Sequence, residues 1–441
     1  MTKKSAIIIY SFLFFTTLTL LFLAVTQRAQ AAAYENYAMA SAAQAAYDFN
    51  SNLKSMDLTL KKAAHTSTAK RLAVLCADAF EAAQKANASL SALPLSSEQT
   101  QKISKYLCVT GDYCMYVLNK CISNEVTQEE RDRLKKLGEY AGDLYEATVT
   151  LGSDLQQGKI ALSFFEETDG AAADSFAAYI VSANDALGGF ESFSYDGKYS
   201  RDNEKRSSVY LASAKEVDEA AAKKTAAEFI GISENILTLE YENEGDIPCY
   251  YFSAPAGVGI CVAKFGGEVA YMTNPRTIGN TSVTVDQALN NASMFLSELG
   301  YKNMKIDVYH LQNGILTASY VYTQDEYTCY PDSVAVGVAC DNGSIVYFDA
   351  GEYLMNHQEI RDIASRSYSR EDIESTLNGA LTVSGHHYGI IMDDSFRELP
   401  VNVFSVSNGG GDSLRVYHNT QTGDEEKLCT SCEYESGSFI Y

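Results

Sequence analysis

Gly266-Gly267-Glu268-Val269-Ala270-Tyr271 is a glycine turn that leads into a run of strand-forming residues, and the second half of the chain repeats this pattern twice. The later copies are Asn342-Gly343-Ser344-Ile345-Val346-Tyr347 and Thr422-Gly423-Asp424-Glu425-Glu426-Lys427. Their glycines, Gly267, Gly343 and Gly423, lie 76 and then 80 residues apart. This spacing is too long for a solenoid repeat and suits small successive domains. The sequence therefore predicts three similar modules in tandem.

Each turn follows a predicted helix and strands. The first helix is expected to end at Gly231 as its C-terminal cap, the second to run from Val285 to Gly300, and the third to begin near Ser369. Strands are expected at residues 249–252, 259–263, 315–322, 334–340 and 414–418. A helix followed by antiparallel strands gives an α+β module in which the helix covers one face of the sheet. We place the modules at residues 213–280, 281–358 and 359–441, and the third is divergent because it keeps little beyond the turn.

The first half of the chain has a helical period instead. Thr127-Gln128-Glu129-Glu130 reads as a capping box, in which the Thr hydroxyl and the Glu carboxylate satisfy free N–H groups at a helix start. An apolar seam with spacings of three and four follows at Leu134, Leu137, Ala141, Leu144, Thr148, Leu151 and Leu155. Further helices are expected at 34–64, 68–90 and 98–122. Residues 34–187 are therefore predicted to form an antiparallel helical bundle.

A change in amino-acid composition separates the two halves of the chain. Gly188-Gly189 opens a stretch rich in Gly, Asp and aromatic residues, which runs through Tyr195-Asp196-Gly197-Lys198-Tyr199-Ser200. Because Asp-Gly is a turn signal, residues 188–212 are predicted to be a linker.

The N-terminus indicates the compartment. Lys3 and Lys4 precede an apolar stretch from Ala6 to Val25, which as a helix would span about 30 Å, the thickness of a bilayer core. We interpret residues 1–33 as a transmembrane anchor. Small residues at Ala29, Ala31 and Ala33 also suit signal peptidase, so a cleaved signal segment is the alternative. Both place the body of the protein outside the cytoplasm.

The charge balance excludes one class of partner. The chain of 441 residues has 57 acidic and 34 basic residues, which gives a formal charge of −23. A surface this acidic repels phosphate backbones, so we expect no nucleic-acid binding.

Ten cysteines fit an extracytoplasmic location, where disulfides persist. Cys249 and Cys261 flank one predicted hairpin, and Cys329 and Cys340 flank the expected counterpart in the next module. Both pairs are predicted to be cross-strand neighbours and are candidate disulfides. The alternative is that they are apolar core thiols.

No catalytic or metal constellation is found in the sequence. His357-Gln358-Glu359-Ile360-Arg361 lacks the second His of a zinc hydrolase, and His386-His387 would point to opposite faces of a strand. Neither a nucleophile elbow nor a phosphate-binding loop is present. We therefore expect a non-enzymatic protein without a cofactor.

Two other stretches carry a family resemblance. Leu93-Pro94-Leu95, followed by Ile103-Ser104-Lys105-Tyr106-Leu107 and Gly111-Asp112-Tyr113, resembles the helical N-terminal region of the spore germination protein family YpeB. Tyr195-Asp196-Gly197 with Ser200 resembles that family's junction before its C-terminal part. The three repeats resemble PepSY modules, which the family carries in tandem. The order of these features matches across nearly the whole chain.

The resemblance implies a non-enzymatic partner of a spore-cortex-lytic peptidoglycan hydrolase, SleB in that family. The expected function is to bind, stabilise and localise this hydrolase until germination, from a membrane-anchored position on the cortex side of the spore inner membrane. PepSY modules also occur in protease propeptides, so the alternative is a membrane-anchored protease inhibitor at the cell surface. A third reading is an enzyme that acts on peptidoglycan itself.

Overall fold

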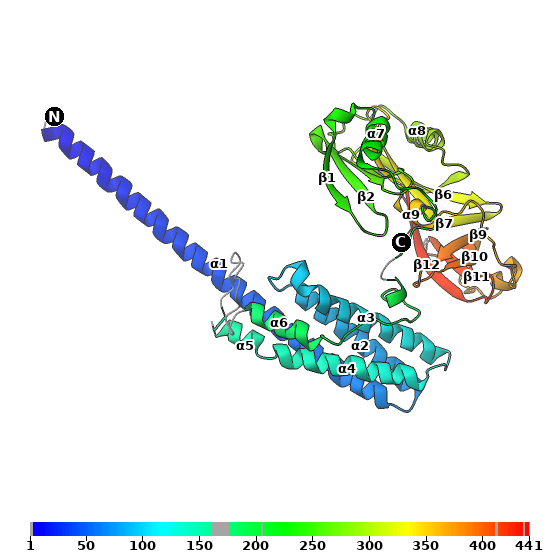
Figure 1. Ribbon diagram of the computed structural model, residues 1–441, viewed down its shortest axis with the longest axis horizontal. Coiled ribbons are helices and arrows are strands. Elements are labelled where there is room, and N and C mark those ends of the chain that lie inside the picture. The colour runs from blue at the N-terminus through cyan, green and yellow to red at the C-terminus, as the bar shows by residue number, and fades with distance from the viewer. Residues whose placement is uncertain are drawn as a thin grey trace. The chain divides into compact units, whose positions relative to one another are not determined.

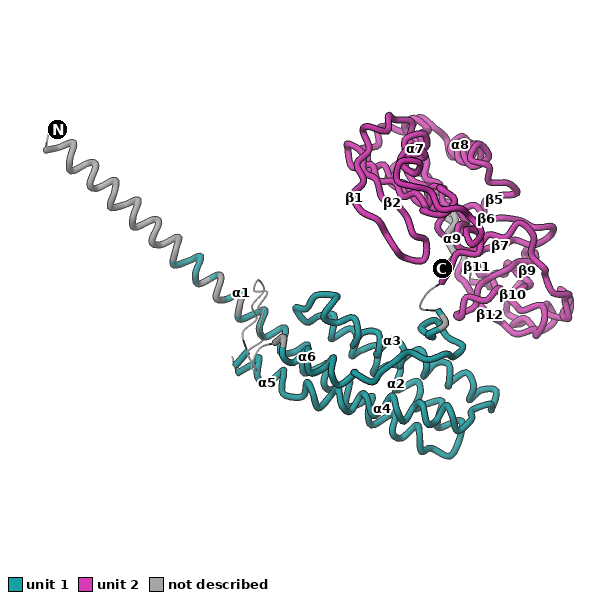
Figure 2. Tube along the Cα trace, in the orientation of Figure 1, with its two compact units in different colours: residues 1–204 teal, residues 205–441 magenta. Residues whose placement is uncertain are grey.

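The computed structural model describes residues 3–157, 159–160, 176–203, 206–410, 413–434 and 437–440. The chain divides into two compact units, residues 1–204 and residues 205–441 (Figure 2). The described regular structure of unit 1 is helical, whereas unit 2 combines helices with a large, mainly antiparallel sheet in which β7 and β9 pair in parallel (Figure 1). The predicted α+β class is confirmed at this level.

Unit 1 is a bundle in which α1 packs against α2 and α4, and α2 packs against α3 (Figure 1). These helices enclose one core, whose largest fully buried side chains include Phe49, Tyr106 and Tyr113. The α-helices are α1 (Lys3–His65), α2 (Ala69–Ser91), α3 (Ser97–Ile122), α4 (Gln128–Thr148), α5 (Leu151–Gln156) and α6 (Phe176–Ala186).

The helix boundaries follow from side-chain caps. The Thr68 hydroxyl accepts the Arg71 N–H at the start of α2, and Ser96 with Gln99 forms a capping box at the start of α3. The capping box predicted at Thr127 is also confirmed, since the Glu130 carboxylate accepts the Thr127 N–H at 2.8 Å. Such caps satisfy N–H groups that have no partner within the helix.

The predicted apolar seam is buried along its whole length, from Leu134 to Leu155. It is not carried by one helix, however. α4 ends at Thr148 and α5 resumes the seam at Leu151. Thr148 is a polar position in this seam that the fold tolerates, because its single hydroxyl proton has two acceptors within reach, the Leu144 carbonyl at 2.9 Å and Asn50 Oδ1 at 2.6 Å.

The predicted anchor falls within the first part of α1. The side chains of residues 1–24 lie outside the described part of the chain. Within the described part, no helix meets the length and hydropathy of a membrane span.

The described part of unit 2 contains three successive groups, each made of a helix followed by strands: four strands in the first and second groups and five in the third. The helices are α7 (Glu219–Ile230), α8 (Val285–Glu298) and α10 (Arg370–Glu374), with the short α9 (Gly351–Asn356) after the second group. The strands are β1 (Thr238–Asn243), β2 (Cys249–Ala254), β3 (Val258–Ala263), β4 (Val269–Thr273), β5 (Met304–Gln312), β6 (Ile315–Gln324), β7 (Tyr327–Ala339), β8 (Ile345–Asp349), β9 (Leu381–Met392), β10 (Glu398–Asn408), β11 (Ser413–Asn419), β12 (Glu425–Tyr434) and β13 (Gly437–Ile440).

The groups share one sheet, in the order β1-β2-β3-β4-β8-β7-β6-β5-β13-β12-β11-β10-β9. β4 pairs antiparallel with β8, for example Tyr271 with Asp349, which joins the first two groups edge to edge. A single core runs beneath both groups. Phe229 of α7 and Phe295 of α8 have ring centroids 5.5 Å apart, so the two helices lie on the same face of this sheet (Figure 1).

The turn glycines have the conformation that the repeat pattern requires. Gly267, Gly343 and Gly423 have φ values of +71°, +77° and +81°. Residues with a side chain rarely adopt this left-handed backbone conformation, which explains why glycine occupies each turn. Gly231 caps α7, as predicted, and has the same conformation.

The third group differs from the first two. Ser369 caps its helix as predicted, but α10 has only five residues, so little of the sheet is covered by it. Ile373 of this helix packs with Phe404, Val406 and Val416 in a small separate cluster. That residues 359–441 are a third PepSY module stays a prediction.

Candidate binding sites

The motifs that carry the family resemblance meet on the side of the bundle. The Tyr195 hydroxyl donates to Asp112 Oδ2 at 2.6 Å, and the Tyr199 N–H donates to the same oxygen at 3.0 Å. The Tyr195 N–H donates to Ser200 Oγ at 3.1 Å, which closes the turn. A Cβ at position 197 would lie 2.6 Å from Asp112 Oδ2, so only glycine allows this approach.

Aromatic stacking reinforces the junction. The Tyr195 ring lies 5.2 Å from that of Tyr113, and Phe193 lies 4.9 Å from Tyr113, both edge to face. Burial raises the pKa of Tyr195, and the hydrogen bond to Asp112 raises it further. The Tyr195 phenol therefore stays neutral and donates its hydrogen bond, so this cluster has a structural role and holds the junction against α3.

The remaining motif residues lie elsewhere or face away. Leu93 and Leu95 contact the core at the α2–α3 turn, and Pro94 is exposed. This turn is far from Asp112, because Ser97 at the start of α3 and Asp112 are about 22 Å apart at 1.5 Å per residue. Asp196 is exposed. Gly111 is buried where α3 packs against α2, and a Cβ there would make ordinary van der Waals contact with the Phe80 ring at 3.4 Å.

The predicted linker, residues 188–212, is not a stretch of free chain. Its first part packs on the bundle through Phe190, Phe193 and Tyr195. Its last part belongs to unit 2, where Ser208 Oγ donates to the Leu354 carbonyl and the Val209 N–H donates to the Met355 carbonyl at 2.8 Å. The aromatic residues that marked a boundary in the sequence are thus partly buried and pack against the core of the bundle.

A pocket of about 300 Å³ lies in unit 2, where the first two groups meet. Its lining comes from the segment before α7, α7 itself, the β3–β4 turn, the start of β4, the loop after α8, β8 and α9. The lining residues are Tyr210, Thr225, Phe229, Gly267, Glu268, Val269, Leu299, Gly300, Tyr301, Phe348 and Tyr353. We call this the inter-module pocket.

Two left-handed glycines position polar residues of the inter-module pocket. Gly267, at φ +71°, directly precedes Glu268, and Gly300, at φ +89°, directly precedes Tyr301. Glu268 accepts a hydrogen bond from the Tyr210 hydroxyl at 2.9 Å. Nothing in the sequence marks Glu268 as different from Ser344 or Asp424, which follow the other two turn glycines. Only the tertiary fold reveals that this turn opens into a pocket.

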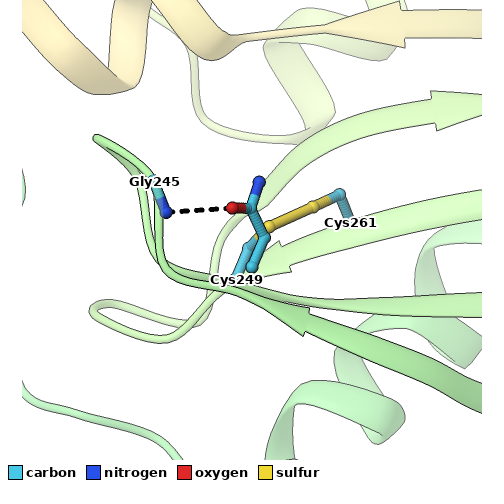
Figure 3. The surroundings of a disulfide bond; sticks show 4 residues. Gly245, Cys249 and Cys261 are labelled. Carbon is cyan, nitrogen blue, oxygen red and sulfur yellow. Dashed lines mark hydrogen bonds between the residues drawn. A yellow bond between two sulfur atoms is a disulfide. The ribbon is translucent and has the colours of Figure 1, made fainter. Parts of the chain in front are cut away.

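The first candidate disulfide is formed in the structure. Cys249 on β2 and Cys261 on β3 are bonded, with Cα atoms 6.1 Å apart (Figure 3). They are diagonal rather than directly opposite, because Cys249 pairs with Ala263 in the strand register. In the turn beside the bridge, the Gly245 N–H donates to the Asn243 side chain at 2.9 Å (Figure 3).

The second candidate pair was wrongly assigned to a hairpin. Cys329 lies near the start of β7 and Cys340 directly follows its end, and both are free and buried. At about 3.3 Å per residue, eleven residues of one strand separate them by roughly 30 Å or more. They cannot form a bridge.

The histidines make structural contacts. His357 Nδ1 lies 2.7 Å from Asp332 Oδ2, His386 Nε2 lies 3.0 Å from Asn402 Oδ1, and His387 Nε2 lies 2.8 Å from the Tyr330 hydroxyl. Burial lowers the pKa of His387 to about 4. Within the described ranges, no group of three His, Cys, Asp or Glu residues is arranged to hold a metal.

Comparison with known proteins supplies the family. Residues 30–163 match the model of the YpeB N-terminal region, and residues 181–364 match that of the YpeB sporulation PepSY1 and PepSY2 domains. Sporulation protein YpeB of Halalkalibacterium halodurans is 24% identical over 82% of this chain and 83% of its own length. Sporulation protein YpeB of Oceanobacillus iheyensis is 22% identical over 81% of this chain and 82% of its own length.

A solved structure, the Bacillus megaterium YpeB C-terminal domain, aligns with 49% of this chain and 98% of that chain, at 24% identity and a TM-score of 0.43. The two family models together span both the helical bundle and the first two helix-and-strand groups, in the order that the sequence motifs predict. The chain therefore belongs to the YpeB family of sporulation proteins.

Proposed function

We propose that this chain is a non-enzymatic protein that binds a SleB-like spore-cortex-lytic hydrolase, stabilises it and holds it in place until germination. The observation that carries the proposal is the match of residues 181–364 to the PepSY1 and PepSY2 domains of YpeB. The family resemblance implies a hydrolase partner, and PepSY modules in protease propeptides restrain an enzyme in the same way.

The arrangement of the two matched modules supports a binding role. β4 and β8 pair directly, and one core continues under both modules. The two modules therefore present one pre-organised surface instead of two that move independently. Association with a partner costs less conformational entropy when the surface is already ordered.

The proposed location is the cortex side of the spore inner membrane. The apolar stretch from Ala6 to Val25 supports attachment to the membrane through the N-terminus. The formal charge of −23 argues against nucleic acid as a partner. In this position the bound hydrolase would lie next to its peptidoglycan substrate.

The test is the amount of hydrolase in dormant spores that lack this chain. We expect strong depletion of the hydrolase protein and restoration when the full-length chain is returned, while its transcript stays at the wild-type level. Normal hydrolase protein in the deletion spores would refute the proposal.

A second measurement addresses the absence of catalysis. The purified full-length chain is incubated with spore peptidoglycan, and soluble muropeptides are measured by chromatography. We expect none above the level of buffer, and release by the chain alone would show an enzyme instead.

A further inference from the structure

The inter-module pocket contains a carboxylate without a cationic partner. Glu268 is the one charged residue among the eleven that line the pocket, and it is half-buried. No Lys or Arg of the described chain forms an ion pair with it, and its described side-chain hydrogen bond is the one from Tyr210. Burial raises the pKa of Glu268, and the opposing effects of the Tyr210 hydrogen bond and of nearby His357 do not offset it. A bound cation would offset this desolvation.

Three tyrosines surround this carboxylate. The ring centroids of Tyr301 and Tyr353 are 4.8 Å apart, and those of Tyr210 and Tyr353 are 5.5 Å apart. All three line the pocket together with Glu268. Burial raises the pKa of each tyrosine, and the charge of Glu268 adds a smaller increase. Aromatic faces attract cations, and they do so more strongly where water is partly excluded.

Two hydroxyl groups in the pocket are available to a ligand. Neither the Tyr301 nor the Tyr353 hydroxyl has a hydrogen-bond partner among the described residues. Together with the second oxygen of Glu268, they provide three acceptors. A primary ammonium group has three N–H donors and no acceptor, so it matches this set.

Other cations fit less well. A quaternary ammonium has no N–H to donate, and Ca²⁺ requires six to eight oxygen ligands whereas this pocket supplies one carboxylate. The apolar walls suit a methylene chain, since Phe229, Val269, Leu299 and Phe348 line the rest of the pocket. A volume of about 300 Å³ is at the small end for ligand pockets.

We propose that the inter-module pocket binds a primary alkylammonium group, with the carboxylate of Glu268 as its counter-ion and the rings of Tyr210, Tyr301 and Tyr353 around it. Two sources share this chemistry, namely a lysine side chain of another polypeptide and a free alkylamine. Because the pocket is built from residues of both matched modules, its occupant would also hold these modules together.

The test measures binding of small probes to the purified full-length chain by saturation-transfer NMR and calorimetry. The probes are Nα-acetyl-lysine methylamide, its Nε-acetylated form and butylamine. We expect both amines to bind and the Nε-acetylated form, which lacks the charge, not to bind. Tighter binding of the lysine amide would assign the pocket to a polypeptide, and tighter binding of butylamine would assign it to a free amine.

Two variants make the result specific. Glu268→Gln keeps the size and an acceptor for Tyr210 but removes the charge, and loss of a charge-assisted hydrogen bond should weaken amine binding roughly tenfold to a hundredfold. Glu298→Gln is the matched control, because Glu298 is exposed beside the pocket loop but does not line the pocket, and it should bind as wild type does. Thermal melting of each variant checks that the fold is kept. The absence of amine binding to the wild-type chain, or equal binding by Glu268→Gln, would overturn the proposal.

Discussion

Replacement of Arg361 by Met should be among the most destabilising single changes in unit 2. The Arg361 side chain is 3% exposed and donates to both oxygens of Asp332, whose side chain is fully buried at 0%. It also pairs with Glu398 of β10 at 2.9 Å and donates to the Asn356 carbonyl at 3.1 Å. The side chain therefore links β7, the segment after α9 and β10, which belong to the second and third groups.

The expected magnitude follows from what remains after the substitution. Arg361→Met leaves the Asp332 charge buried with only His357 beside it, and loss of one partner of a buried ion pair costs about 3–5 kcal/mol. For a unit of this size, that corresponds to a fall in Tm of roughly 6–20 °C. The double variant Asp332→Asn, Arg361→Met removes both charges and should recover part of the loss.

The assay is thermal and urea unfolding of the full-length chain, with hydrogen exchange and mass spectrometry to localise the effect. The protection of backbone amides from hydrogen exchange should fall first in β7 and β10. Arg370→Met is the control, because the Arg370–Glu374 pair has side chains that are 46% and 40% exposed and should contribute less than about 1 kcal/mol. The reasoning is refuted if Arg361→Met costs no more than Arg370→Met, or if the double variant is less stable than both single variants.

Three further predictions concern local structure. Replacing both Cys249 and Cys261 by Ser should destabilise unit 2 by roughly 2–4 kcal/mol, measured by urea unfolding. A reductant that destabilises the double variant as much as it destabilises the wild-type chain would contradict the bridge. Tyr195→Phe should cost unit 1 about 1–3 kcal/mol because a carboxylate loses its donor, and an unchanged melting temperature would contradict this. Burial alone would raise the pKa of Glu130, but hydrogen bonds from Lys120 and Thr127 outweigh it and lower the pKa to about 2 from 4.5. Its contribution is therefore present above pH 4.5 and lost as the pH falls toward about 2, so the difference in Tm between wild type and Glu130→Gln should shrink over that range.

Local signals in the sequence predicted much of the fold. The cap at Thr127, the left-handed Gly231 and the three turn glycines each depend on neighbours within a few residues, so they could be read directly. The order of bundle followed by helix-and-strand groups could be read for the same reason.

The assignment of Cys329 failed because the strand that carries it is longer than expected. From the sequence, this strand is expected to start only at Val334. In the structure β7 already begins at Tyr327, and its register with β6 shifts between Cys329 and Ser333, so the strand accommodates Pro331 at an irregularity. Cys329 and Cys340 therefore belong to the same strand.

The inter-module pocket could not be predicted for a different reason. It exists because β4 pairs with β8, and this pairing brings residues from Tyr210 to Tyr353 to one place. Periodicity in the sequence reflects neighbours along the chain and does not predict which distant strands pair. The same holds for Asp112 and Tyr195, which could be named as separate motifs but not as partners in one hydrogen bond.

The central claim, that this chain holds a cortex-lytic hydrolase, is tested most directly by affinity capture of the full-length chain from dormant spores, followed by quantitative mass spectrometry. The account predicts that a cortex-lytic hydrolase co-purifies in near-equal amount and is lost from the capture once germination is complete. Capture of a protease in place of the hydrolase, or of no peptidoglycan hydrolase at all, would contradict it.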